Sequence, residues 1–281
     1  MPRFKLFLEY EGTRYSGWQV QKNARTIQGE LIGVVRKVFE TDEFELYGAG
    51  RTDAGVHALG QVAHLDVKTV LAPEIIRQRM NDNLPADINI LEAEKAAKNF
   101  HARHDALARV YLYQISRRRT AFGKRYVWWI KDTLYAAKMQ DAASLFLGMK
   151  NFASFTADDA EEKSTSVLVR DITIREAGAV ILFRITGSHF LWKQVRQIVG
   201  VLAEVGRGHL TQGDIRRFLE VQTNEPAQYT APPSGLFLER VIYKGDPLEV
   251  PLGPVLNLPH PPGKRSHEHR ADRGTTIQLR A

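Results

Sequence analysis

The sequence predicts an α+β fold made of two similar halves in tandem. The order strand, helix, strand, strand, helix, strand occurs twice along the chain, and 281 residues are enough for two compact units. The chain has 43% hydrophobic and 25% charged residues, which is ordinary for a globular protein. It has no cysteine, which excludes disulfides and thiolate metal sites. The sequence shows neither a membrane-spanning run nor a secretory signal, so we expect a cytoplasmic protein.

The first half is expected over residues 1–104. Thr26 is a typical N-cap before an amphipathic helix, and Pro73 suits the first turn of a second helix. Alternating apolar residues mark the strands. The expected strands are 3–9, 44–48, 61–67 and 88–93, and the expected helices are 27–39 and 73–81.

The second half is expected over residues 105–250 with the same order of elements. Its expected strands are 106–116, 166–175, 179–186 and 236–243, and its expected helices are 133–147, 190–205 and 214–219. Two such units predict two ferredoxin-like halves, each an antiparallel sheet with helices on one face, and an active-site cleft between them.

Residues 251–281 lose all apolar periodicity and are expected to form a disordered basic tail. They carry part of the net charge of +7, a modest excess that permits nucleic-acid binding without demonstrating it. Three histidines of this tail, His260, His267 and His269, are better explained by solvation than by metal binding.

The segment from Gly48 to Ala58 is the strongest candidate for chemistry. It has three glycines, one cation (Arg51) and one carboxylate (Asp53), and it lies between two expected strands. Its glycine spacing is neither that of a dinucleotide site nor that of a P-loop. From these residues alone, a surface hairpin in which Arg51 pairs with Asp53 explains the pattern equally well.

The string GRTDAGVHA at 50–58 resembles the signature loop of the TruA family of tRNA pseudouridine synthases. Four more strings resemble motifs of that family, in the same order, although Val110 replaces a frequent arginine and Trp192-Lys193 departs from the commoner residues. These strings are YEGTRYSGWQVQ at 10–21, ARVYLY at 108–113, FLWKQVRQIVG at 190–200 and APPSGL at 231–236.

The resemblance implies an isomerase that converts uridine to pseudouridine in the anticodon stem-loop of tRNA, at positions 38, 39 and 40. It implies no cofactor, and it implies a homodimer. Asp53 becomes the catalytic nucleophile, Arg51 the residue inserted into the RNA, and Tyr111 a ring that stacks on the uracil. The sequence leaves three first steps open for Asp53: attack on the sugar, attack on the base, or removal of a ribose proton. The family pattern pairs Arg196 with the catalytic aspartate and packs Leu236 against the site. Further expected RNA contacts are His57, His101, Arg103, Arg109 and Lys193.

Other interpretations remain open from the residues alone. The basic and aromatic stretches 117–119 and 124–129 are typical of a solvated surface, and beside the motifs we expect them in an RNA-backbone groove. A metal site at Asp53, His57 and His64 is disfavoured because the spacing fits no helical pair and His64 is expected to face out of a strand. A tandem RNA-binding module and a glycosidase are the rival classes; the latter needs a second carboxylate.

Overall fold

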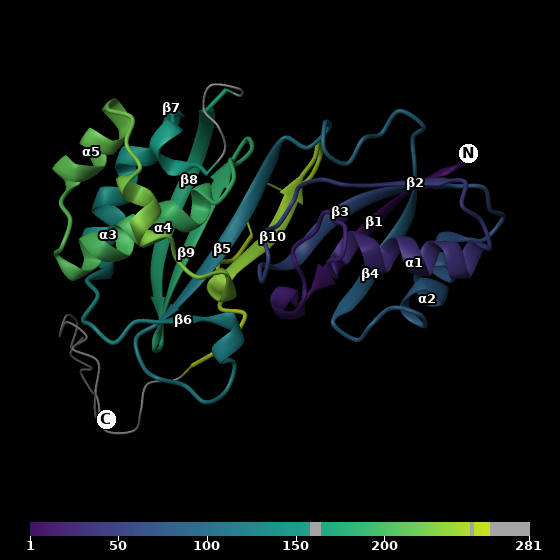
Figure 1. Ribbon diagram of the computed structural model, residues 1–281, viewed down its shortest axis with the longest axis horizontal. Helices are drawn as coiled ribbons and strands as arrows, with labels where there is room; N and C mark the ends of the chain where they lie inside the picture. The colour runs from purple at the N-terminus through teal and green to yellow at the C-terminus, as the bar shows by residue number, and fades with distance from the viewer. Residues whose placement is uncertain (158–163, 248–249, 259–281) are drawn as a thin grey trace, which may run out of the picture.

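A computed structural model describes residues 1–157, 164–247 and 250–258 of the chain. The fold is mixed α+β, with one ten-stranded sheet through the molecule and helices packed at both ends of it (Figure 1). The strands are β1 (Arg3–Tyr10), β2 (Phe44–Gly48), β3 (His57–Val67), β4 (Ile88–Ala96), β5 (Ala108–Ser116), β6 (Trp128–Trp129), β7 (Gly148–Asn151), β8 (Ser166–Ala177), β9 (Val180–Gly187) and β10 (Leu236–Ile242). The described α-helices are α1 (Ile27–Phe39), α2 (Pro73–Asn81), α3 (Ala136–Ala143), α4 (Gln194–Arg207) and α5 (Gln212–Glu220).

The sheet is continuous and mixed, which corrects the expectation of two separate antiparallel sheets. Its order is β4-β1-β3-β10-β5-β9-β8-β7, with β2 also paired to β3 and β6 to β5. The two halves join where β10 runs parallel to β3, at the pairs Phe237–His57 and Leu238–Ala58. This junction exists because the short β2 covers only the far end of β3, at 63–67, and leaves its beginning for β10.

The first half follows the sequence pattern closely. Alternate residues of β1 are buried, and they join the core under α1, where Leu31 and Val35 are fully buried. The Thr26 side chain accepts a hydrogen bond from the Gly29 amide and caps α1, as its sequence predicts. Burial of one strand face against two helices fixes the register of the sheet that leads into the signature loop.

The strand β5 divides the second half into two faces. Tyr111 and Tyr113 join the main core, whereas Leu112 packs in a separate cluster on the opposite face, which we call the back face. Residues 251–258, expected in the tail, instead pack on this back face. Leu258 is buried there, and its carbonyl accepts a hydrogen bond of 2.8 Å from the Ala179 amide. The remainder of the expected tail, 259–281, lies outside the described residues.

Several element boundaries differ from expectation. The helix expected at 133–147 ends at Ala143 and continues as a 3-10 turn to Phe146. The helix expected from residue 190 begins at Gln194, because Lys193 adopts a left-handed conformation with φ of 62°. The short strands β6 and β7 were not expected, since two and four residues carry too little alternation to be recognised. None of the helices in the described ranges has the length and apolar character needed to cross a bilayer.

Candidate functional site

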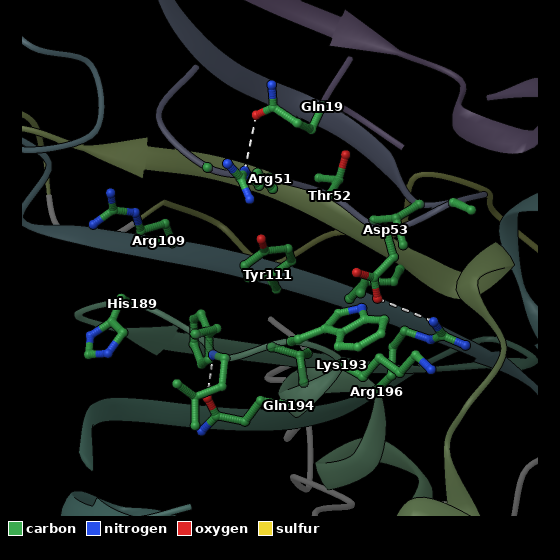
Figure 2. Close-up of a pocket in the computed structure, with 18 of the residues that line it drawn as sticks. Gln19, Arg51, Thr52, Asp53, Arg109, Tyr111, His189, Lys193, Gln194 and Arg196 are labelled. Atoms are coloured by element: carbon green, nitrogen blue, oxygen red, sulfur yellow. Dashed lines mark hydrogen bonds and ion pairs between the residues drawn. The ribbon is translucent and has the colours of Figure 1, made fainter. Parts of the chain in front are cut away.

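A cavity of about 860 Å³ lies between the two halves of the molecule. The first half supplies residues of the 16–21 loop and the signature loop, and the second half supplies β5 and the turn before α4 (Figure 2). Candidate residues from the sequence that line it are Arg51, Asp53, Arg103, Arg109, Tyr111, Lys193, Arg196 and Leu236. The structure therefore gathers residues that are far apart in the sequence into one hollow.

The signature loop is held in place by backbone hydrogen bonds to the preceding polar loop. The Trp18 amide donates to the Thr52 carbonyl at 3.0 Å, and the Gly55 amide donates to the Tyr15 carbonyl at 3.2 Å. Gly17 permits the close approach, because a Cβ there would lie 2.4 Å from the Thr52 carbonyl oxygen. These contacts hold the loop on both sides of position 53.

The three signature glycines have different roles. Gly55 has a positive φ of 77°, which side-chain-bearing residues adopt with strain. Gly48 lies against the Trp18 indole, where a Cβ would come within 2.5 Å of the ring. Gly50 has open space around its Cα. Backbone freedom is therefore needed at Gly55. Gly48 instead must lack a side chain because it packs closely against Trp18.

Asp53 and Arg196 form an ion pair across the cavity. Arg196 Nη1 lies 3.3 Å from Asp53 Oδ2, and Arg196 Nε donates to the Ala231 carbonyl at 2.7 Å (Figure 2). The two side chains are 24% and 13% exposed, respectively, so the pair is partly shielded from water. Arg51 does not pair with Asp53: its Nε donates to the side chain of Gln19 at 3.0 Å. The surface-hairpin alternative is therefore wrong.

Tyr111 presents its hydroxyl to the same hollow, between Arg51 and Asp53 (Figure 2). Its ring packs edge-on against Phe190, with centroids 5.4 Å apart and planes at 85°. Burial, with smaller contributions from Tyr10 and Asp53, raises the pKa of Tyr111 well above its ordinary value. The side chain is thus a neutral phenol at neutral pH, able to donate or accept a hydrogen bond beside the carboxylate.

Arg109 is a structural tie as well as a cavity residue. Its guanidinium donates to the carbonyls of Ala49, Arg103 and Ser188, at 3.0, 2.7 and 2.9 Å. Burial lowers the pKa of Arg109, and a fourth carbonyl, that of Ala106, also accepts a hydrogen bond from the guanidinium at 3.2 Å. The residue therefore connects the start of the signature loop to the segment that precedes α4.

Two histidines expected to contact RNA lie outside the cavity. His57 is 1% exposed, so its ring is not accessible to a ligand, and this expectation is wrong. His101 lies on a neighbouring loop, where its Nδ1 accepts a hydrogen bond from the Arg103 amide at 3.1 Å. His64, expected to face out of its strand, is also buried, and its Nδ1 accepts from the Ala102 amide. Each of these buried histidines accepts a hydrogen bond at Nδ1 from a remote backbone amide, which satisfies that nitrogen inside the protein.

The other candidate segments from the sequence also lie outside the cavity. The basic stretches 117–119 and 124–129 do not line the cavity, and Tyr126 instead packs against His57 on the back face. Within the described ranges there is no group of three or more His, Cys, Asp or Glu side chains placed to hold a metal ion.

Sequence reasoning missed several residues of the cavity wall, among them Gln194 and His189. Gln194 is fully buried, and its Oε1 accepts a hydrogen bond of 2.9 Å from the Leu191 amide, which stabilises the turn before α4. His189 also lines the cavity, and burial, with Arg109 and Arg103 nearby, lowers its pKa. Gln194 lies inside the string at 190–200 and His189 immediately precedes it, but a helical interpretation of that string hides the turn that brings both side chains to the cavity.

Comparison with known proteins gives consistent results. The family model described as tRNA pseudouridine synthase matches residues 6–105 and 142–244. The chain is similar to tRNA pseudouridine synthase A of Afipia carboxidovorans, at 38% identity over 86% of this chain and 100% of the relative. The namesake from Pseudothermotoga lettingae is 38% identical, covering 86% and 99%. That of Levilactobacillus brevis is 35% identical, covering 89% and 97%.

Proposed function

Because the chain belongs to the tRNA pseudouridine synthase family, we propose that its cavity receives a uridine of tRNA and converts it to pseudouridine. The observation that carries this proposal is the Asp53–Arg196 pair beside the Tyr111 hydroxyl, in one hollow built by both halves. The reaction breaks the bond between ribose C1′ and N1 and forms one between C1′ and C5. The hydrogen on C5 is replaced, and N1 gains one, so the product is an isomer and no cofactor is consumed.

Asp53 is the catalytic nucleophile in this proposal. Its carboxylate is the one acidic group among the described residues that line the cavity. Arg196 lies 3.3 Å from it and is itself fixed by the Ala231 carbonyl, so the arginine orients the carboxylate and offsets its charge. A preorganised pair of this kind costs no rearrangement when substrate enters.

The nucleotide must leave its stack to reach Asp53. Extrusion costs a few kcal/mol, and less near a loop than inside a long duplex. Arg51 fills the vacated space, and the Tyr111 ring stacks on the extruded uracil, with Leu236 as an apolar contact. The volume of about 860 Å³ is ample for one nucleotide.

The anticodon stem-loop, at positions 38, 39 and 40, is the proposed target region. Arg103 and Lys193 line the cavity, where neutralisation of phosphates gives salt-sensitive affinity. A homodimer, which derives from the resemblance of the signature strings, and a cytoplasmic location, which derives from the composition of the sequence, belong to the same proposal.

We also propose that each half is a ferredoxin-like domain, divided near residue 104. The order β4-β1-β3-β2 in the first half supports this, as does β10-β5-β9-β8 in the second. Both orders place the fourth strand of the unit beside the first and the third beside the second. Residues 250–258 then belong to the second domain, since Arg184 donates to the Val250 carbonyl at 2.9 Å.

The test is to incubate the protein with an unmodified tRNA transcript and to map pseudouridine along it. We expect pseudouridine at positions 38, 39 or 40, and none in a transcript that carries cytidine at all three. Pseudouridine at another position would refute the proposed target but not the activity. Release of free uracil would indicate a glycosidase, and unchanged RNA a binding module; either result would overturn the proposed reaction.

A further inference from the structure

His57 is the first residue of β3, four positions after Asp53, and its ring lies on the back face of the sheet. The ring stacks on Phe237 of β10, with centroids 4.8 Å apart and planes at 25°. Tyr126 packs edge-on against it at 5.4 Å. The ring therefore faces away from the cavity, and no proposed step of the reaction uses it.

Both ring nitrogens of His57 are hydrogen-bonded to the backbone of different halves. Nδ1 accepts from the Gly12 amide at 3.0 Å, and Nε2 lies 3.0 Å from the Arg125 carbonyl. Because Nδ1 accepts, Nε2 must carry the proton and donate it. One neutral tautomer therefore satisfies both contacts at once and joins residue 12 of the first half to residue 125 of the second.

The Gly12 end of this bridge is packed against the catalytic loop. A Cβ on Gly12 would lie 1.9 Å from the Val56 carbonyl oxygen, so the two backbones are in close contact. The Val56 amide in turn donates to the Asp53 carbonyl at 3.1 Å, closing the turn that carries the carboxylate. The His57 ring is thus connected to Asp53 through the backbone contacts of Gly12 and Val56.

The Arg125 end is anchored to the second half. The carbonyl of the next residue, Tyr126, accepts a hydrogen bond of 2.8 Å from the buried Gln114 side chain. The Oε1 of Gln114 accepts from the Val255 amide at 2.7 Å. The segment whose carbonyl accepts the hydrogen bond from His57 is thus fixed to the central strand β5.

We propose that His57 is a positioning residue for the reaction: it fixes the turn that carries Asp53 relative to the half that carries Tyr111 and Arg196. This inference rests on the proposed function, in which Asp53 is the reacting group. A displacement of about 1 Å at a reacting atom is enough to cost roughly 10²-fold in rate. Loss of the bridge is therefore expected to lower turnover while leaving the RNA-binding surface intact.

His64 provides a matched control on the same strand. It is also 1% exposed, and its Nδ1 also accepts from a backbone amide, that of Ala102. That partner lies within the first half, and its own carbonyl accepts a hydrogen bond of 2.5 Å from the Tyr243 hydroxyl. Replacing His64 therefore removes a buried strand histidine while leaving the His57 contacts to Gly12 and Arg125 in place.

The experiment compares His57→Phe with His64→Phe, each of which keeps a ring and removes its hydrogen bonds. Single-turnover rate, KM and Kd for tRNA, and Tm are measured for both. We expect His57→Phe to lower the rate 10- to 100-fold with KM and Kd within about threefold of the parent. We expect His64→Phe to keep the rate within about twofold despite a similar loss of Tm.

His57→Gln, which retains an acceptor and a donor, is expected to recover at least part of the lost rate, and it also serves if His57→Phe does not fold. A parent-like rate in His57→Phe, or in His57→Gln if the former is unfolded, would overturn the proposal. Equal rate losses in the His57 and His64 variants would also overturn it, because they indicate a purely structural role. If the parent protein itself forms no pseudouridine, the proposed function fails instead, and the two failures are distinguishable.

Discussion

The two halves of the molecule contribute to the cavity in different ways. The first half presents Asp53 on a glycine-rich loop held by backbone hydrogen bonds to another loop. The second half presents Tyr111 from a central strand and Arg196 from a helix whose other residues are almost all buried. Loop contacts thus hold the reacting group, Asp53, whereas a packed core holds its partners Tyr111 and Arg196. Neither half alone contains the ion pair, so the site depends on how the halves are joined.

The largest loss of rate is expected when Asp53, the group that the first half contributes, is replaced. Asp53→Asn keeps the size of the side chain and removes its charge, so pseudouridine formation should fall by roughly 10³-fold or more. Binding of tRNA should stay within a few-fold of the parent, because the cationic residues of the cavity remain. Single-turnover assays and a filter-binding assay measure the two quantities. Asp105→Asn, an exposed carboxylate near Arg103, is the control, and robust product from Asp53→Asn would refute the role.

A smaller loss of rate is expected when Arg196, the partner that the second half contributes, is replaced. Arg196→Lys cannot both contact Asp53 and donate to the Ala231 carbonyl with the same geometry, because lysine lacks the planar fork. We expect a rate loss of about 10²-fold. Arg207→Lys changes the same residue type on the same helix, where Arg207 pairs with Asp132 and Glu204 instead. If Arg196→Lys and Arg207→Lys lose rate equally, the second half does not act through the pair between Arg196 and Asp53, and the comparison between the halves is wrong.

Tyr111→Phe separates stacking from hydrogen bonding. The variant keeps the ring and its contact with Phe190, and loses the hydroxyl that faces the cavity. We expect roughly a tenfold loss of rate, the equivalent of one hydrogen bond of about 1.4 kcal/mol. Tyr113→Phe removes a hydroxyl that donates to the Pro232 carbonyl at 2.8 Å, and it should cost about 1 kcal/mol of stability with little loss of rate. An unchanged rate in Tyr111→Phe leaves that ring as a stacking platform alone.

The last prediction concerns the stability of the first half, and we expect it to leave the rate almost unchanged at neutral pH. Burial, with Arg3 and His101 nearby, lowers the pKa of His64 to about 4, whereas the unfolded chain has the ordinary value near 6.5. The unfolded state therefore binds the proton first, and the free energy of unfolding falls as pH drops from about 6.5 toward 4, by at most roughly 3 kcal/mol. Urea unfolding at pH 7 and pH 5 measures this. His64→Gln should show a shallower pH dependence, and an unchanged slope would contradict the assignment.

Sequence patterns predicted the local structure and much of the cavity wall. The Thr26 cap and the apolar stripe that follows it give α1, and the alternation of β1 gives its buried face. These features depend on residues a few positions apart. The strings around Asp53, Tyr111 and Arg196 located residues that do line the cavity.

The remaining features depend on contacts between remote segments, which no local pattern contains. His64 is expected to face out of its strand and His57 to contact RNA from the signature loop, yet backbone amides of distant segments donate hydrogen bonds to both rings inside the protein. The parallel pairing of β10 with β3 joins positions about 180 residues apart and is invisible to alternation. Lys193 sits in a string with helical periodicity, but its positive φ turns the chain before α4 begins.

The strand β10 is the last strand of the described chain, and it lies between β3 of the first half and β5 of the second. Its first residue, Leu236, also lines the cavity. A ribosome-bound chain thus carries every polar group of the site for some time before the element that brings the halves together has emerged. Activity should therefore appear only once β10 has emerged, and chains that end before Leu236 should form no pseudouridine.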